Sequence, residues 1–180
     1  MAVLPVRTFP DSVLKTPART VDSIAPHITK LVDDLIDTMR HHPRCVGLAA
    51  PQVGAGVRVA VVDVGSHPKT GSSASGLLVC INPKIIEQDG ALVQREGCQS
   101  VPDLTGNVRR ATRVRVTALD AKGREWTKWC EGFEAIAIQH EVDHLAGTLF
   151  LDRIANIRTD VFRRKRYWFP GEGEGKPSAR

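Results

Sequence analysis

The sequence feature that most constrains this chain is an HExxH pattern, His140-Glu141-Val142-Asp143-His144. Histidines four residues apart lie one turn from each other on the same face of an α-helix, so both imidazoles can reach one cation. Glu141 lies about 100° further around the helix and can address an attacking water instead. The pattern predicts a helix over residues 131–146, ended by Gly147, and indicates hydrolysis. Without a third ligand, two ordinary surface histidines remain the alternative.

Downstream of the pattern, the third ligand is missing from its usual place. In the longer motif HExxHxxGxxH, Gly147 fits, but Phe150 occupies the third histidine position and cannot bind a metal. Upstream, Cys98 lies beside a flexible glycine in the stretch EGCQS (residues 96–100). Its thiolate would complete a Cys-His-His set with one position left open. A buried structural cysteine is the other interpretation of Cys98.

A third distinctive stretch is GLAAPQVG, residues 47–54. Small residues let the backbone approach another backbone or a ligand closely, and Pro51 stiffens the turn. Gln52 is a neutral polar side chain among apolar neighbours. Its amide can donate to an oxygen that becomes negative during attack, or it can make a structural hydrogen bond, and this segment does not decide between the two.

The remaining pattern favours an α+β fold. Apolar residues recur at helical spacing over residues 26–40, where Pro26 lies near the first turn and Ser23 is the expected N-cap. Short β-branched runs predict strands over 58–64, 77–82 and 113–119. A surface hairpin loop is expected over 66–76, and a short basic C-terminal helix over 152–166.

Composition is that of an ordinary globular protein. The 180 residues are 42% hydrophobic and 25% charged, which predicts a single catalytic domain over residues 1–169, followed by a disordered tail over 170–180. No apolar run approaches the ~20 residues needed to cross a bilayer, and the opening lacks the features of a signal peptide, so we expect a cytoplasmic location and no membrane partner. The four cysteines form no CxxC pair and are expected to be reduced.

The net charge of +5 is unevenly distributed. Residues 109–128 carry 7 basic and 2 acidic side chains, and residues 152–180 carry 8 and 4, whereas residues 129–151 hold four acids and no Lys or Arg. This pattern permits contact with a polyanion but is not the uniform basic stripe of a sequence-specific DNA-binding protein. A solvated charged surface is the simpler interpretation.

Together, the stretches GLAAPQVG, EGCQS and QHEVDHLAG resemble, in order and spacing, the three signature motifs of peptide deformylases. The opening LPVRTFPDSVLKTPA and the segments RATRVRVTALD and GTLFLDRI are also similar to that family, so the resemblance covers residues 1–166. It implies a bacterial-type α+β enzyme in which antiparallel sheets pack around the central HExxH helix, with an N-terminal and a C-terminal helix. It also implies the reaction: hydrolytic removal of the formyl group from the N-terminal formyl-methionine of nascent proteins, with release of formate.

The same resemblance assigns roles by position. Cys98, His140 and His144 would hold one divalent metal, Fe²⁺ in the cell in most members, which Zn²⁺, Ni²⁺ or Co²⁺ can replace. Glu141 would take a proton from the attacking water and deliver it to the departing amine. Gln52 and the backbone N–H of Gln99 would stabilise the oxyanion, and Gly47 would bind the peptide backbone. The expected slot for the methionine side chain is lined by Val46, Phe133, Ile136 and Ala137.

The chain departs from the family pattern at three positions. Cys45 stands where a glycine is usual, and Gln99 replaces a leucine. Many bacterial members carry an arginine seven residues after the cysteine to contact the substrate backbone, whereas this chain has Thr105, with Arg109 and Arg110 a little further on. The change at Thr105 bears on peptide affinity and not on metal binding.

Two alternatives to a deformylase follow from these departures and from the metal ligands. The first is a catalytically weak relative that acts as a ribosome-binding or metal-binding module, which the intact Glu141 disfavours. The second is a zinc endopeptidase, which Phe150 disfavours. Ribosome contact is an expectation for the enzyme as well, because five basic residues gather near the C-terminus: Arg158, Arg163, Arg164, Lys165 and Arg166. The sequence predicts that truncation after Ile157 weakens this contact but leaves turnover intact.

Overall fold

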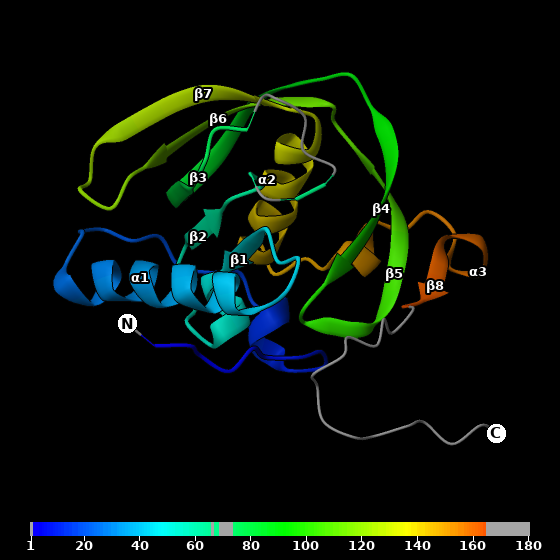
Figure 1. Cartoon of the computed structure of the whole chain (residues 1–180), viewed down its shortest axis with the longest axis horizontal. Helices are drawn as coiled ribbons and strands as arrows, with labels where there is room; N and C mark the ends of the chain where they lie inside the picture. Colours follow the sequence, from blue (N-terminus) through cyan, green and yellow to red (C-terminus); the bar gives the residue numbers. More distant parts are fainter. Residues whose placement is uncertain (1, 66, 69–73, 165–180) are drawn as a thin grey trace.

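Helix α2 (Gly132–Leu145) runs through the middle of the molecule, between two antiparallel sheets (Figure 1). The computed structural model describes residues 2–65, 67–68 and 74–164. Helix α1 (Pro26–His41) packs against strands β1 (Gly47–Ala49) and β2 (Val59–Val62) of the larger sheet. The α+β class predicted from the sequence is confirmed, and α2 is the helix that carries the HExxH pattern.

The larger sheet has the strand order β1-β2-β3-β6-β7 and the smaller one the order β4-β5-β8, with every neighbouring pair antiparallel. The strands of the larger sheet are β1 (Gly47–Ala49), β2 (Val59–Val62), β3 (Leu78–Asp89), β6 (Arg113–Leu119) and β7 (Glu125–Glu131). Those of the smaller sheet are β4 (Leu92–Cys98), β5 (Val101–Arg110) and β8 (Val161–Arg163). Short helical turns are η1 (Ser12–Lys15), η2 (Ala50–Val53), η3 (Phe150–Arg153) and the one-turn α3 (Ile157–Asp160).

Ten of the 14 residues of α2 are buried and only Gly132 is exposed, so this helix has no solvent-facing polar side. Most of its buried polar side chains therefore have specific partners. Gln139, for example, accepts a hydrogen bond from the Ala111 N–H (3.0 Å) and donates one to the Ala111 carbonyl (2.9 Å). The helix ends at Leu145, and Gly147 follows the C-cap with a φ of 71° and a close approach to the Lys15 backbone, both of which require glycine. This packing fixes the position of both motif histidines.

Helix α1 buries an apolar stripe, as its periodicity predicted, with Ile28, Val32, Leu35 and Met39 in the core. The predicted cap is wrong: the N-cap is Ala25, which makes no side-chain hydrogen bond, and the helix begins directly with Pro26. Proline needs no capping partner at the first helical position because it has no N–H to satisfy.

Strand β6 has the predicted bounds, whereas β2 is shorter than expected and β3 continues well beyond the predicted end at Asn82. Asn82 takes a φ of 53°, and the register shifts between Ile81 and Lys84, so a bulge carries the strand past Pro83. The Asn82 amide exchanges two hydrogen bonds with the Val21 backbone, at 2.9 and 2.8 Å. The bulge therefore has a tertiary partner that sequence pattern could not reveal.

The predicted C-terminal helix over 152–166 is wrong for the described part of that range. The chain forms η3, then the single turn α3, and then β8, which pairs with β5. Asn156 caps α3 by accepting from the Arg158 N–H, but Val161 and Phe162 then enter an extended strand, because an edge of β5 is available to them. Residues 165 and 166 lie outside the described residues, as does the predicted tail over 170–180, so the domain range 1–169 stays a prediction.

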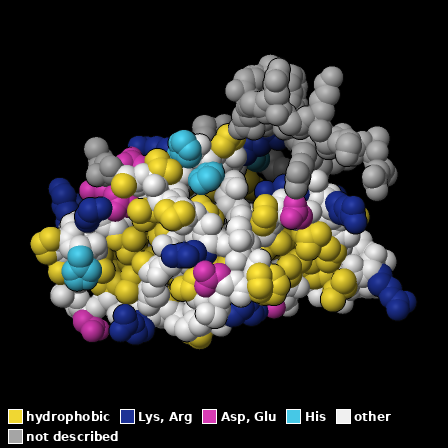
Figure 2. Space-filling model, turned by 90° about the horizontal axis from the view of Figure 1, so that it is seen from below, with side chains coloured by type: hydrophobic (Ala, Val, Ile, Leu, Met, Phe, Trp, Pro, Cys, Tyr) yellow, Lys and Arg dark blue, Asp and Glu magenta, His cyan; other side chains and the backbone are white. Residues whose placement is uncertain are grey.

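The surface of the described residues mixes charges. On the face drawn in Figure 2, Lys and Arg side chains alternate with Asp and Glu, and no continuous basic stripe crosses its described part. The predicted hairpin loop joins the antiparallel strands β2 and β3, although residues 66 and 69–73 within it are outside the described residues. In the described ranges, no helix has both the length and the apolar character that a membrane crossing requires. All four cysteines are free thiols.

Candidate metal centre and active site

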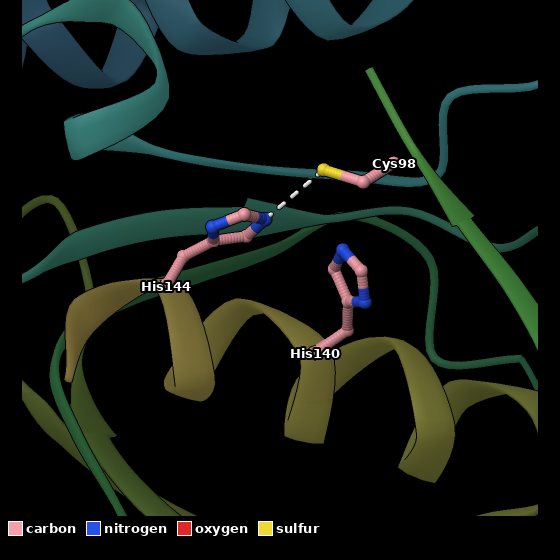
Figure 3. Close-up of side chains that lie close together, drawn as sticks. All are labelled: Cys98, His140 and His144. Carbon is pink, nitrogen blue, oxygen red and sulfur yellow. Dashed lines mark hydrogen bonds between the residues drawn. The ribbon is translucent and has the colours of Figure 1, made fainter. Parts of the chain in front are cut away.

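Two elements bring three ligand atoms together. Helix α2 presents His140 and His144 one turn apart, and the end of β4 places Cys98 opposite them (Figure 3). The Cys98 Sγ lies 3.2 Å from His144 Nε2, the two imidazole centroids are 4.9 Å apart, and one ligand atom from each residue falls within 4.8 Å of the others. The structure thus brings together all three residues that the resemblance implied as ligands.

The chemistry of this donor set fits a divalent transition metal. Burial alone would raise the pKa of the Cys98 thiol, but His144 and His140 lower it well below its ordinary value. The sulfur also accepts hydrogen bonds from the Ser100 N–H and the Gln52 amide, both at 3.3 Å. A thiolate with two imidazoles is a set that Zn²⁺ and Fe²⁺ can share, and it leaves one coordination position for water or substrate.

Glu141 is a buried carboxylate beside this cluster. Among the described residues its Oε2 has no hydrogen-bond partner, and burial raises the pKa of the carboxyl to about 7. A general base with a pKa near the working pH transfers protons most efficiently. The carboxylate also explains why residue 47 is a glycine, because a Cβ at that position would lie under 3.0 Å from Glu141 Oε1.

Behind His140 lies a buried network of charges. Glu96 Oε2 is 2.8 Å from His140 Nδ1, and both Glu96 oxygens accept from Arg110, at 2.7 and 3.0 Å. Arg110 also donates to Asp143 (2.6 Å), which Arg153 binds from the other side. Burial would raise the pKa of Glu96, but the hydrogen bonds from His140 and Arg110 lower it to about 2. This arrangement fixes the His140 ring with Nε2 turned toward the cluster.

Removal of Arg110 should be strongly destabilising. In Arg110→Met, Glu96 and Asp143 lose a shared cation at side chains that are 5% and 7% exposed. Breaking a buried ion pair from one side costs about 3–5 kcal/mol, which urea unfolding would measure. The matched control is Arg109→Met, on the exposed neighbouring residue, which should stay within about 0.5 kcal/mol of wild type. A loss below about 1 kcal/mol in Arg110→Met would contradict this account.

A groove of about 340 Å³ opens onto the cluster. Its lining includes Cys98, His140, Glu141 and every residue expected to contact substrate: Val46, Gly47, Gln52, Gln99, Phe133, Ile136 and Ala137. The structure therefore gathers these residues at one site, although their roles stay predictions. Arg110 is buried in the network described above, and within the described chain neither it nor Arg109 lines the groove.

Gln52 makes structural hydrogen bonds, the second of the alternatives that its segment left open. Its Oε1 accepts from the Ala49 N–H (2.9 Å), and its Nε2 donates to Cys98 Sγ and to Ser100 Oγ (3.2 Å). The oxyanion role is therefore a prediction that requires one of these donors to turn toward substrate. Cys45 also lines the groove, where its thiol donates to the Gly47 carbonyl (3.1 Å) and burial raises its pKa to about 12.

Sequence reasoning missed several residues of the groove. His67 stacks on Phe133 with ring centroids 4.5 Å apart, and Arg44, Gln94, Arg95 and Arg164 contribute polar lining. None belongs to a signature motif, and Arg164 is 66 residues from Cys98 in the sequence. The basic character of residues 158–166 was the one available signal, and it pointed toward a partner surface and not toward the groove.

Comparison with known proteins agrees with this geometry. The family profile described as polypeptide deformylase matches residues 3–160. The chain belongs to this family. A peptide deformylase from Thermodesulfovibrio yellowstonii is 41% identical over 165 residues, which span 92% of this chain and 97% of the relative.

Solved structures of the family share the fold. A peptide deformylase from Ehrlichia chaffeensis in complex with actinonin has a TM-score of 0.81 at 36% identity, covering 88% of this chain and 92% of the other. A Met-Ala-Ser-bound peptide deformylase from Acinetobacter baumannii has a TM-score of 0.78 at 37% identity, covering 85% and 99%. Like other members of the polypeptide deformylase family, the protein is a hydrolase that removes the formyl group from the N-terminal methionine of nascent peptides, and the family uses a single metal.

Proposed function

We propose that one divalent cation is held by Cys98 Sγ, His140 Nε2 and His144 Nε2. The observation that carries the proposal is the convergence of these three side chains beside Glu141, a buried carboxylate whose Oε2 has no hydrogen-bond partner among the described residues. When bound, the cation supplies Lewis-acid polarisation and lowers the pKa of water. We further propose Fe²⁺ as the metal in the cell, with Zn²⁺, Ni²⁺ or Co²⁺ able to replace it. Metal analysis after anaerobic purification tests this, and stoichiometric zinc in that sample would contradict it.

Proton transfer belongs to Glu141. Its carboxylate takes a proton from the attacking water as the C–O bond forms at the formyl carbon, and it returns that proton to the amine as the C–N bond breaks. The backbone N–H of Gln99 and the amide of Gln52 stabilise the negative oxygen that develops between these steps. For Gln52 this requires Nε2 to give up its bond to Ser100 Oγ, while the bond that Oε1 accepts from the Ala49 N–H keeps the side chain in place.

The apolar part of the groove receives the methionine side chain. Val46 precedes β1, and Phe133, Ile136 and Ala137 come from the first turns of α2, so these four form one wall beside Glu141. Gly47 lies next to Val46 and leaves its backbone open to the peptide chain. Such a slot accepts an unbranched thioether by dispersion contacts and selects against charged first residues.

Hydrolysis of formyl-Met-Ala-Ser, with the acetylated peptide as control, separates the three interpretations of the chain. A deformylase releases formate from the first peptide only, an endopeptidase cleaves internal bonds in both, and a binding module does neither. The Met-Ala-Ser bound to the Acinetobacter baumannii relative supports the choice of peptide. Absence of formate from the metal-loaded protein would contradict the proposed function.

We also propose that the enzyme works in the cytoplasm and docks on the ribosome through its basic C-terminal residues. Nascent chains emerge from a particle rich in RNA phosphate, so clustered cations would raise the local enzyme concentration. Truncation after Ile157 is not a clean test, because it removes β8, which pairs with β5, and Arg164, which lines the groove. A variant that keeps both is needed.

The sharper variant changes Arg158, Arg163, Lys165 and Arg166 to glutamine and keeps Arg164. In ribosome co-sedimentation, log affinity falls as log salt rises, and each lost phosphate contact should make this fall less steep by about one unit of slope. Turnover of formyl-Met-Ala-Ser should not change. Equal, salt-independent sedimentation of variant and wild type would show that these charges are a solvated surface.

A further inference from the structure

A guanidinium from the C-terminal end of the described chain lies in the groove. Arg164 directly follows β8, and its backbone N–H donates to the Asp103 carbonyl at 2.8 Å. Its Nη2 donates to the carbonyl of Cys98 at 3.2 Å, next to the metal cluster. The side chain is partly buried and lines the groove together with Gly97 and Thr105. A charged group is therefore held in the groove that opens onto the metal cluster.

The smaller sheet fixes this side chain from one face. Gly97 of β4 pairs with Thr105 of β5, and Thr105 pairs with Phe162 of β8, so the three residues form a row across the sheet. Arg164 lies two residues beyond Phe162 and so shares its face. On the same face the Arg95 guanidinium stacks on the Phe162 ring, 3.4 Å from its centroid. That stack connects β8 to β4 across the intervening strand β5.

The space that Arg164 occupies exists because two neighbouring side chains are small or absent. A Cβ built at Gly97 would lie under 3.0 Å from Arg164 Nη2, and 3.3 Å from both Arg164 Cζ and Thr105 Cγ2. The guanidinium therefore lies in a slot beside Gly97 and Thr105, from which a side chain at position 97 would displace it. An arginine at 105 would project into the same slot.

The two sides of the groove differ in composition. The β1 and α2 side carries the apolar Val46, Phe133, Ile136 and Ala137 together with the polar Arg44 and His67, whereas the smaller sheet contributes the polar Gln94, Arg95 and Arg164. If methionine contacts the apolar residues, the following residues of the peptide extend along the smaller sheet. Carbonyl oxygens are what such an extended peptide offers at every residue, and a guanidinium has five N–H donors for them. In the described structure Arg164 uses one of these donors, in the hydrogen bond from Nη2 to the Cys98 carbonyl.

We propose that Arg164 binds main-chain carbonyl oxygens of the residues that follow formyl-methionine, as a peptide-binding residue supplied by β8. The inference rests on the proposed function, because it takes the groove to be the deformylase substrate site. Charge-assisted hydrogen bonds that are equally strong in the ground and transition states change KM and leave kcat alone. The effect of Arg164 must therefore grow with the length of the peptide.

The test compares formyl-Met-Ala-Ser amide with formyl-methionine amide, two uncharged C-termini that differ in length. Arg164→Ala and Arg164→Gln should raise KM for the tripeptide about 10- to 100-fold, with kcat within about threefold of wild type. KM for formyl-methionine amide should change less than about threefold. Arg164→Gln keeps a polar side chain with an amide donor but removes the guanidinium, and so controls for the loss of packing that Arg164→Ala causes. The matched control, Arg163→Ala, removes an exposed charge from the adjacent position and should leave both KM values unchanged.

A rescue variant sharpens the result. Thr105→Arg combined with Arg164→Ala places a guanidinium in the slot from β5, and KM for the tripeptide should return to within about threefold of wild type. The proposal is overturned if both Arg164 variants keep the wild-type KM for the tripeptide, or if KM rises equally for the two substrates, which would mean that Arg164 acts through Cys98. Failure of the wild-type enzyme to release formate from either substrate would instead count against the proposed function.

Discussion

Glu141→Gln is expected to lower kcat for formyl-Met-Ala-Ser by at least about 10²-fold while the protein keeps its metal. Glutamine is nearly isosteric and fits beside Gly47, but its amide cannot accept the proton of the attacking water. Formate release and metal content of the same preparation are the two measurements. Glu131→Gln, an exposed change of the same chemistry at the N-cap of α2, is the matched control and should retain turnover.

Two outcomes would contradict the role of Glu141. Near-wild-type turnover in Glu141→Gln would mean that another group takes the proton. Loss of metal together with turnover would mean that the carboxylate holds the cation or its ligands and is not a base. The geometry favours neither, because Glu141 lies outside the three-residue cluster and its Oε2 has no partner among the described residues.

Cys98→Ala is expected to lose metal and activity together. Loss of an outer-shell partner alone costs about 10- to 100-fold in metal affinity, so removal of a ligand should weaken binding by at least about 100-fold. Metal content after gel filtration and competition with a chelator would measure this. Cys45→Ala is the matched control, because it removes a second thiol from the same groove without touching the cluster. Wild-type metal content in Cys98→Ala would remove Cys98 from the ligand set.

The candidate site could be predicted from the sequence because its chemistry is local. His140, Glu141 and His144 share one helical turn, and the helix that carries them has nearly the bounds its pattern predicts. The residues alone left Cys98 as either a ligand or a structural cysteine, and the resemblance to a family decided between them, because no spacing rule connects Cys98 to His140, 42 residues further on. In the structure, the β4–β5 hairpin makes that connection by ending β4 beside α2.

The C-terminal part of the fold could not be predicted for a similar reason. Residues 152–166 carry no strong helical or strand periodicity, and the free edge of β5 decides that Val161 and Phe162 become a strand. The position of Arg164 follows from that pairing and from the absence of a side chain at Gly97. A sequence scan finds a basic residue there, but only the register of β8 places it in the groove.

A metal titration tests whether one cation at the Cys98–His140–His144 cluster supports deformylation. Protein stripped with a chelator is titrated with Ni²⁺ while the rate of formate release from formyl-Met-Ala-Ser is recorded at each step. We expect no activity in the stripped protein, a linear rise in rate and a break at one equivalent per chain. Full activity without metal, or a break at two equivalents, would contradict this expectation.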